Sequence, residues 1–273
     1  MTFDAEEFAL YQIGNAPVLR YPFAHFFIQP IFPEEYFKTL RAQLPPTEWM
    51  SPMAETGVIK VVDGVKKKVV SQAYPGRYSA DLANIEERAE AAGLPHFWGD
   101  LGRWLMSDRL RQLLLNKFHP DIAQRFGADA VLGTEIDARL VRDFTNYAIG
   151  PHTDAPRKLV SLLFYLPADS ALSHLGTSIF AHQDPSYRCE GKRHHGFDGF
   201  KKIASMPYVS NSLFVFFKTD YSFHGLDQIQ DAGVQRDLIL YNIYVQSVGR
   251  QRPSSWLAPW RRKHTRATFF KND

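Results

Sequence analysis

Short apolar segments dominate the second half of the chain, and several of them alternate apolar with polar residues. Five such segments stand out: 134–144 (TEIDARLVRDF), 158–167 (KLVSLLFYLP), 176–182 (GTSIFAH), 211–218 (NSLFVFFK) and 237–247 (DLILYNIYVQS). Turn-rich stretches separate them, without long helical patterns. Many short strands connected in this way predict a β-sandwich, a jelly roll or a barrel.

The first half of the chain follows a helical period instead. Residues 80–127 space their apolar positions by three and four, with breaks at Gly93, Pro95 and Pro120, which predicts two or three helices. Ser107 is a candidate N-cap. A further helix should begin near Glu34 and end before Pro45.

Residues 58–70 contain Asp63-Gly64 between two β-branched runs, which predicts a β-hairpin. The chain therefore divides into three parts. We expect a helix-rich portion with a hairpin at 1–127, packed on a mainly β core at 128–249, and a basic, aromatic tail at 250–273.

Composition indicates a globular protein with an ample core, because 45% of the 273 residues are apolar and 14% are aromatic. The single cysteine, Cys189, excludes an intramolecular disulfide. The N-terminal residues have no basic and apolar signal pattern, and no run approaches the ~20 apolar residues of a membrane span. We therefore expect a cytoplasmic protein without membrane association.

The net charge of +3 is unevenly distributed. Residues 250–273 carry seven Lys and Arg against one acid, so the other 249 residues sum to −3. The tail could contact nucleic acid or an anionic partner, but a solvated segment whose aromatics pack on the domain is the simpler interpretation. Because the body has no basic excess, the charge does not indicate a nucleic-acid-binding protein.

Candidate chemistry centres on His152-Thr153-Asp154, just before the 158–167 segment. Such a triplet is not specific by itself, since His119-Pro120-Asp121 has the same form at a predicted helix boundary. At a strand end, however, residues i and i+2 point to the same side, so His152 and Asp154 can bind one ion. His224, in YSFHGLDQI, would complete the facial triad of two imidazoles and one carboxylate that binds Fe(II).

Arg236 begins the apolar segment that follows His224, and beyond the adjacent Asp237 no acid lies within that strand. An unpaired buried cation is costly, so Arg236 needs an anionic partner. One explanation is that its guanidinium binds the carboxylate of a ligand. The other is an ordinary ion pair with Asp237 or Asp231.

In this order, the triplet, the distal histidine and the arginine resemble the Fe(II)/2-oxoglutarate-dependent oxygenase superfamily, in its prolyl-hydroxylase-like and phytanoyl-hydroxylase-like branches. The resemblance covers about residues 130–246, including GPHTDAPRKLVSLLFYLP and NSLFVFFKTDYSFHGLDQI. It implies a double-stranded β-helix, a jelly-roll fold similar to the cupins. It also implies that His152, Asp154 and His224 bind iron and that Arg236 binds the distal carboxylate of 2-oxoglutarate.

Three more positions become candidates for binding the cosubstrate or, in the case of Asn242, either the cosubstrate or the substrate. Tyr165 matches a tyrosine that contacts the same carboxylate in prolyl-hydroxylase-like proteins, and strand parity puts it on one face with Ser161. Parity from Arg236 likewise directs Asn242 inward. The prolyl-hydroxylase branch has a bulky aromatic residue at this position, so we do not assign the substrate specificity of that branch to this protein. Tyr147 is the third candidate. The alternative is that Tyr147 is a half-buried tyrosine with only a structural role.

The resemblance implies a dioxygenase that uses Fe(II), 2-oxoglutarate and O₂ and releases succinate and CO₂. We expect it to oxidise a C–H bond of a small-molecule or carbohydrate-like substrate. Halogenating relatives lack the carboxylate ligand, so Asp154 favours hydroxylation, desaturation or demethylation. Two alternatives stay open: a cupin-like metal-dependent isomerase or sugar-binding module, and a hydroxylase or demethylase of protein or nucleic acid.

The other motifs in the sequence are weaker evidence for a functional site. The spacing of His182, Cys189, His194 and His195 fits no compact zinc site. These residues lie in a long predicted loop, 182–207, for which a substrate-lid role is the better interpretation. The sequence has no GxSxG, GxxxxGK[ST] or GxGxxG, so hydrolase, P-loop and Rossmann functions have no support.

Overall fold

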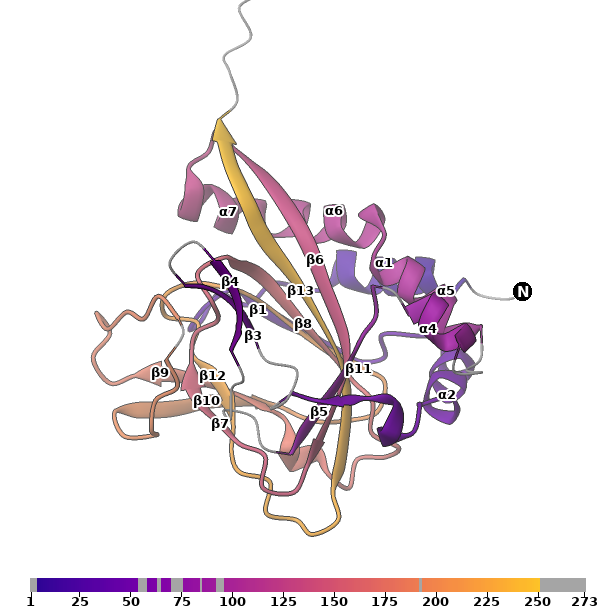
Figure 1. Cartoon of the computed structure of the whole chain (residues 1–273). Coiled ribbons are helices and arrows are strands. Elements are labelled where there is room, and N and C mark those ends of the chain that lie inside the picture. Colours follow the sequence, from indigo (N-terminus) through magenta and orange to yellow (C-terminus); the bar gives the residue numbers. More distant parts are fainter. Residues whose placement is uncertain are drawn as a thin grey trace, which may run out of the picture.

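The computed structural model describes residues 4–53, 58–62, 65–69, 76–83, 85–91, 96–191 and 193–250. Its largest element is an antiparallel sheet in the order β1-β11-β8-β13-β6-β5-β2 (Figure 1). Its strands are β1 (His25–Ile28), β2 (Ser51–Pro52), β5 (Arg77–Asp81), β6 (Ala130–Phe144), β8 (Lys158–Tyr165), β11 (Ser212–Phe217) and β13 (Gln235–Arg250).

A second antiparallel sheet has the order β10-β9-β12-β7. It consists of β7 (Ile149–His152), β9 (Thr177–His182), β10 (Phe200–Met206) and β12 (His224–Leu226). Buried side chains from both sheets form one cluster, including Ile179 of β9, Phe214 of β11 and Leu238 of β13. The two sheets form a double-stranded β-helix, which confirms the predicted fold class.

Helices pack on the outer face of the larger sheet (Figure 1). They are α1 (Ala5–Asn15), α2 (Glu34–Ala42), α4 (Ile85–Ala91), α5 (Phe97–Leu105), α6 (Asp108–Lys117) and α7 (His119–Phe126), with 3₁₀ turns η1 (Thr47–Trp49) and η2 (Ser173–Leu175). Leu105, Leu110 and Leu114 share a hydrophobic core with Leu162 and Ile239. This core leaves the opposite face of the sheet free for the second sheet.

Most local predictions for the first half are confirmed. Helix α2 ends before Pro45, and β3 (Val58–Val62) pairs with β4 (Val65–Val69) as a hairpin. In the described part of residues 80–127 there are four helices rather than two or three. Ser107 occupies the N-cap position of α6, but its side chain makes no capping hydrogen bond. His119 begins α7, as the helix-boundary interpretation requires.

The loop predicted at 182–207 is shorter than expected. Residues 200–206 form β10, which pairs with β9 through a bulge. Its sequence, FKKIASM, has two lysines near its start, which favours a loop, but Ile203, Ala204 and Met206 pack on the core between the sheets. The division at residue 127 stays a prediction, although β1, β2 and β5 of the first portion extend the larger sheet. The predicted tail lies outside the described residues beyond Arg250.

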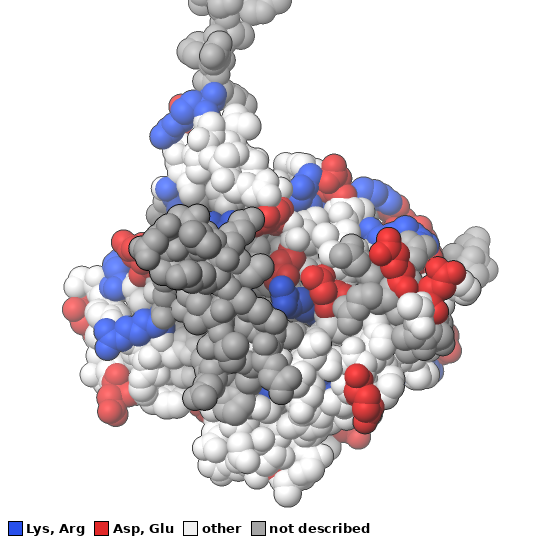
Figure 2. Space-filling view, viewed as in Figure 1, with Lys and Arg blue, Asp and Glu red and all other residues white. Residues whose placement is uncertain are grey.

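On the face shown in Figure 2, Lys and Arg side chains are interspersed with Asp and Glu. Within the described residues, no helix has the length and apolar character needed to cross a bilayer.

Candidate metal centre and cavity

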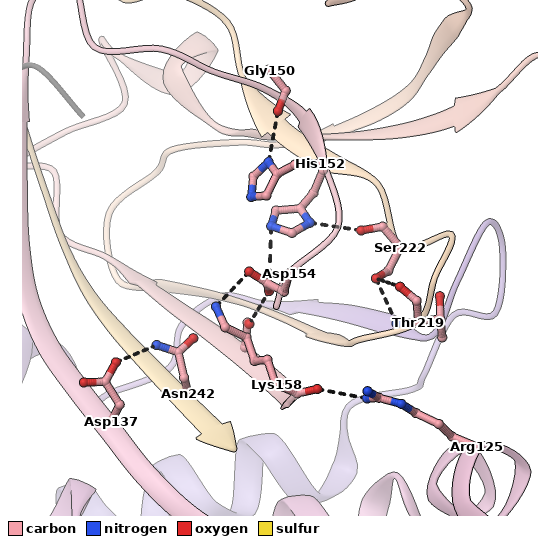
Figure 3. A network of polar contacts seen from close by, with 11 residues as sticks. Arg125, Asp137, Gly150, His152, Asp154, Lys158, Thr219, Ser222 and Asn242 are labelled. Carbon is pink, nitrogen blue, oxygen red and sulfur yellow. Dashed lines mark hydrogen bonds and ion pairs between the residues drawn. The ribbon is translucent and has the colours of Figure 1, made fainter. Parts of the chain in front are cut away.

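The three predicted metal ligands come together between the sheets. His152 ends β7, Asp154 follows two residues later, and His224 begins β12 directly opposite His152 in the antiparallel pairing. One ligand atom from each lies within 4.8 Å of the others, and all three residues are buried. In the described part of the chain this is the only such group of three or more His, Cys, Asp or Glu. Two strands of the smaller sheet thus place both imidazoles and the carboxylate around one point (Figure 3).

Both imidazoles are oriented by main-chain carbonyls. Nδ1 of His152 lies 2.9 Å from the Gly150 carbonyl oxygen, and Nδ1 of His224 lies 3.0 Å from that of Ser222 (Figure 3). A carbonyl can only accept, so Nδ1 carries the proton and Nε2 is left with a lone pair. Burial lowers the pKa of both histidines, most strongly that of His152, which also lies close to His224. The rings are therefore neutral, as metal ligands must be.

Asp154 accepts hydrogen bonds on both carboxylate oxygens. Lys158 donates to Oδ1 at 2.8 Å and Ser161 donates to Oδ2 at 2.9 Å (Figure 3). Burial would raise the pKa of Asp154, but the Lys158 ammonium beside it lowers it below its usual range. The side chain is thus an ionised carboxylate in a fixed orientation.

Lys158 is a residue that the sequence reasoning missed. It is buried, and although burial lowers its pKa, the Asp154 carboxylate raises it further, so it stays protonated. A signal was present, because a lysine that begins an apolar strand four residues after Asp154 needs a nearby anion. Parity nevertheless predicted the inward face correctly, since Ser161 and Leu163 line the cavity.

The segment before β10 packs on the His152–Asp154 turn. Thr153 donates its hydroxyl to the Cys189 carbonyl at 2.6 Å, and the His195 amide donates to the Pro151 carbonyl at 2.9 Å. A Cβ on Gly150 would lie 2.2 Å from the His195 carbonyl oxygen, so only glycine allows this approach. The His194 ring lies 4.8 Å from that of His152. These contacts put the predicted lid segment beside the triad, while its role as a lid stays a prediction.

Arg236 is buried, and the premise that it lacks a protein carboxylate is wrong. Its Nη1 lies 2.7 Å from Oδ2 of Asp143, the residue opposite it on β6, and its Nε donates to the Leu175 carbonyl at 2.8 Å. Neither Asp237 nor Asp231, the two predicted alternatives, is the partner. Asp143 also contacts the guanidinium of Arg77 through both oxygens, at 2.6 and 2.9 Å. One carboxylate is therefore shared by two arginines, and it compensates Arg236 only in part.

Two tyrosine rings flank Arg236, at 5.5 Å for Tyr165 and 5.1 Å for Tyr208. The Tyr165 hydroxyl donates to the Thr177 hydroxyl at 2.7 Å and accepts from the Thr177 amide at 3.2 Å. Burial raises the pKa of Tyr165, so its hydroxyl remains protonated. Tyr147, the other predicted tyrosine, lies beneath the guanidinium of Arg77 at 4.1 Å. The predicted cosubstrate residues thus surround a basic site, with Asn242 further along β13.

A cavity of about 590 Å³ connects the triad with this basic site. Its lining includes all three metal-ligand candidates together with Arg77, Tyr147, Thr177, Arg236, Leu240, Asn242, Asp137, Arg139, Lys158 and Tyr244. A volume of this size suits a small-molecule site. The candidate metal ligands, a basic site and a polar region therefore share one cavity.

No protein-family model and no curated protein matches the chain. Among solved structures, similar ones include HygX from Streptomyces hygroscopicus with nickel, 2-oxoglutarate and hygromycin B bound, at 12% identity and a TM-score of 0.43 over 81% of this chain and 82% of that one. A Pseudomonas putida prolyl-4-hydroxylase has 13% identity and a TM-score of 0.47 over 88% and 100%. A Burkholderia pseudomallei 2OG-Fe(II) oxygenase family oxidoreductase has 12% identity and a TM-score of 0.44 over 89% and 91%. These likenesses are distant, so the function must be inferred from the residues of this chain.

Proposed function

We propose that this protein is an Fe(II)- and 2-oxoglutarate-dependent dioxygenase that oxidises a C–H bond of a small molecule. The observation that carries the proposal is a cavity with two ligand sites of different chemistry. A triad of two neutral imidazoles and one carboxylate lies in the same space as a buried arginine whose charge is only partly compensated. A cosubstrate that chelates a metal and ends in a carboxylate satisfies both.

The donor set fits Fe(II). His152, Asp154 and His224 supply the two imidazoles and one carboxylate of the facial triad, which leaves other coordination positions for exogenous ligands. Lys158 and Ser161 fix the carboxylate, and the Gly150 and Ser222 carbonyls fix the imidazoles. The bound metal supplies the redox chemistry by which decarboxylation of 2-oxoglutarate to succinate and CO₂ is coupled to oxidation of the substrate.

Arg236 is the residue assigned to the distal carboxylate of 2-oxoglutarate. Arg236 is 1% exposed, shares Asp143 with Arg77 and lines the cavity, so its guanidinium can accommodate a further carboxylate. A bidentate carboxylate suits a planar guanidinium better than a point anion does. Thr177 and the two arginines line the cavity together, and Arg77 is a further candidate contact for the same carboxylate.

The alternatives lack a matching observation in the described residues. A cupin-like isomerase or sugar-binding module needs the triad and the cavity but has no use for a shared buried arginine. A hydroxylase or demethylase of protein or nucleic acid would have to insert a residue or base into a cavity of about 590 Å³. A cavity of this volume lies within the range of small-molecule sites.

Anaerobic titration of the protein with Fe(II) and 2-oxoglutarate tests the proposal. We expect a visible metal-to-ligand charge-transfer band, which His152→Ala abolishes. Arg236→Ala should weaken 2-oxoglutarate binding by about 10- to 100-fold, because a charge-assisted hydrogen bond contributes about 1.5–3 kcal/mol. Arg188→Ala, outside this cavity, is the matched control and should bind normally. If the unaltered protein gives no band, the oxygenase proposal is wrong.

A further inference from the structure

Strand β13 lines the cavity at two separate places. Arg236 lies near its start, and Asn242 lies six residues later, about 20 Å along an extended strand. The inward residue Leu240 also lines the cavity between them. Ser161, which donates to Asp154, is opposite Asn242 in the pairing of β8 with β13. The cavity therefore continues past the triad to a second polar region, which the cosubstrate bound toward Arg236 does not fill.

Asn242 in this second region has an unsatisfied acceptor. Its Nδ2 donates to Oδ2 of Asp137, its opposite residue on β6, at 3.4 Å (Figure 3). A carboxylate only accepts, so this contact fixes the amide orientation and turns Oδ1 away from Asp137. The side chain is 1% exposed, and Oδ1 has no hydrogen-bond partner among the described residues. A buried amide oxygen without a partner is costly, and a donor from a bound molecule would satisfy it.

The charges in this region are balanced in pairs. Arg139 donates to Asp137 at 2.8 Å, and Lys158 donates to Asp154 at 2.8 Å. These are the two cations that line the second region in the described structure, and each has its own carboxylate. No spare cation is left for an anionic substrate. By the same pairing no spare carboxylate is left among these residues for an ammonium group, so the missing donor is a neutral one.

We propose that Asn242 and Asp137 form a hydroxyl-binding subsite, and that the substrate is a neutral, polyhydroxylated small molecule. This inference rests on the proposed function, which places the substrate beside the triad. Oδ1 of Asn242 accepts a hydrogen bond from one substrate hydroxyl, and the Asp137 carboxylate accepts a hydrogen bond from a second. Tyr244, which also lines this region, adds an aromatic surface for the carbon face of such a molecule.

Binding of a charge-varied sugar panel tests the subsite. The full chain, loaded with Ni(II) and 2-oxoglutarate so that no substrate is consumed, is titrated calorimetrically with glucose, galactose, myo-inositol, glucosamine and glucuronate. At least one neutral member should bind about 10-fold or more tightly than glucosamine and glucuronate. Asn242→Leu and Asp137→Asn should each remove that preference by weakening the neutral ligand at least about 10-fold. Asn15→Leu, an exposed asparagine on α1, is the matched control and should retain it.

The inference is overturned if a charged sugar binds best, if no neutral member binds, or if both subsite variants retain the preference. Thermal unfolding of each variant identifies any that do not fold, and the two substitutions act on different strands. The same panel is titrated into the metal-free protein, and the charge-transfer band is measured separately. A normal band without neutral-sugar binding refutes the subsite alone, whereas sugar binding without a band refutes the oxygenase proposal alone.

Discussion

Removing the Asp143 carboxylate should be among the most destabilising single changes in the described part of the protein. Asp143 is fully buried and accepts three charge-assisted hydrogen bonds from Arg77 and Arg236, at 2.6, 2.9 and 2.7 Å. Asp143→Ala takes away the carboxylate that both guanidiniums contact, while Arg236 remains in a site from which water is largely excluded. Loss of one partner from a buried ion pair costs about 3–5 kcal/mol.

Equilibrium unfolding in urea measures the change directly, as a shift of the midpoint at constant slope. For a chain of this size a loss of about 3–5 kcal/mol corresponds to a Tm lower by about 10 °C. Asp100→Ala is the matched control, because Asp100 forms an exposed ion pair with Arg103 and should change stability by less than about 1 kcal/mol. If Asp143→Ala destabilises no more than Asp100→Ala, the shared-carboxylate description of this site is incorrect.

Two further predictions concern the packing around the cavity. Gly150→Ala should destabilise the protein by about 1–3 kcal/mol and weaken metal binding about 10-fold, because the new Cβ would lie 2.2 Å from the His195 carbonyl oxygen beside His152. Gly196→Ala, which meets no atom within 4 Å, should change neither quantity, and equal effects of the two substitutions would contradict the argument. Burial lowers the pKa of His25, so below pH ~6.5 the unfolded chain binds a proton that the folded protein does not, and stability falls as the pH falls. Urea unfolding at pH 7.5 and 5.5 should show a smaller loss for His25→Phe than for the unaltered protein, and identical losses would exclude His25 as a contributor.

Side-chain periodicity predicted part of the cavity lining. Alternation put Ser161 on one face with Tyr165 and put Asn242 on the same face as Arg236, and Ser161, Arg236 and Asn242 all line the cavity. His152 and Asp154 were predictable for the same reason, since they are two residues apart at a strand end, whereas His224 lies on a separate strand. Each of these inferences needs only the sequence within one strand.

Contacts between strands were not predictable in this way. Asp143 is 93 residues from Arg236 and 66 from Arg77, and the three meet because β6 pairs with β13 on one side and β5 on the other. Alternation gives the face of a strand but not its register, so a distant carboxylate could not be matched to its arginine. The carboxylate partner of Arg236 therefore lies on a neighbouring strand, not on the strand that contains Arg236.

The buried pair of Lys158 and Asp154 was missed for a different reason. Lysine is rarely buried, so a lysine before an apolar run is normally taken as the solvated end of a strand. Here the fold needs a donor behind the metal-binding carboxylate, and the desolvation cost of Lys158 is offset by its 2.8 Å contact with Asp154. A function that requires a fixed carboxylate thus overrides the ordinary burial preference.

The two polar regions of the cavity depend on one strand. β13 lies between β6 and β8 and pairs with both, so Arg236 and Asn242 are held in fixed register against Asp143, Asp137 and Ser161. A shift of β13 by one residue would turn Arg236 and Asn242 to the opposite face, away from these three partners. The register of β13 therefore sets the spacing between Arg236, the carboxylate of the triad and the amide of Asn242. Under the proposed function, this fixed spacing would let the cavity discriminate a substrate by the distance of its hydroxyl groups from the carbon that is oxidised.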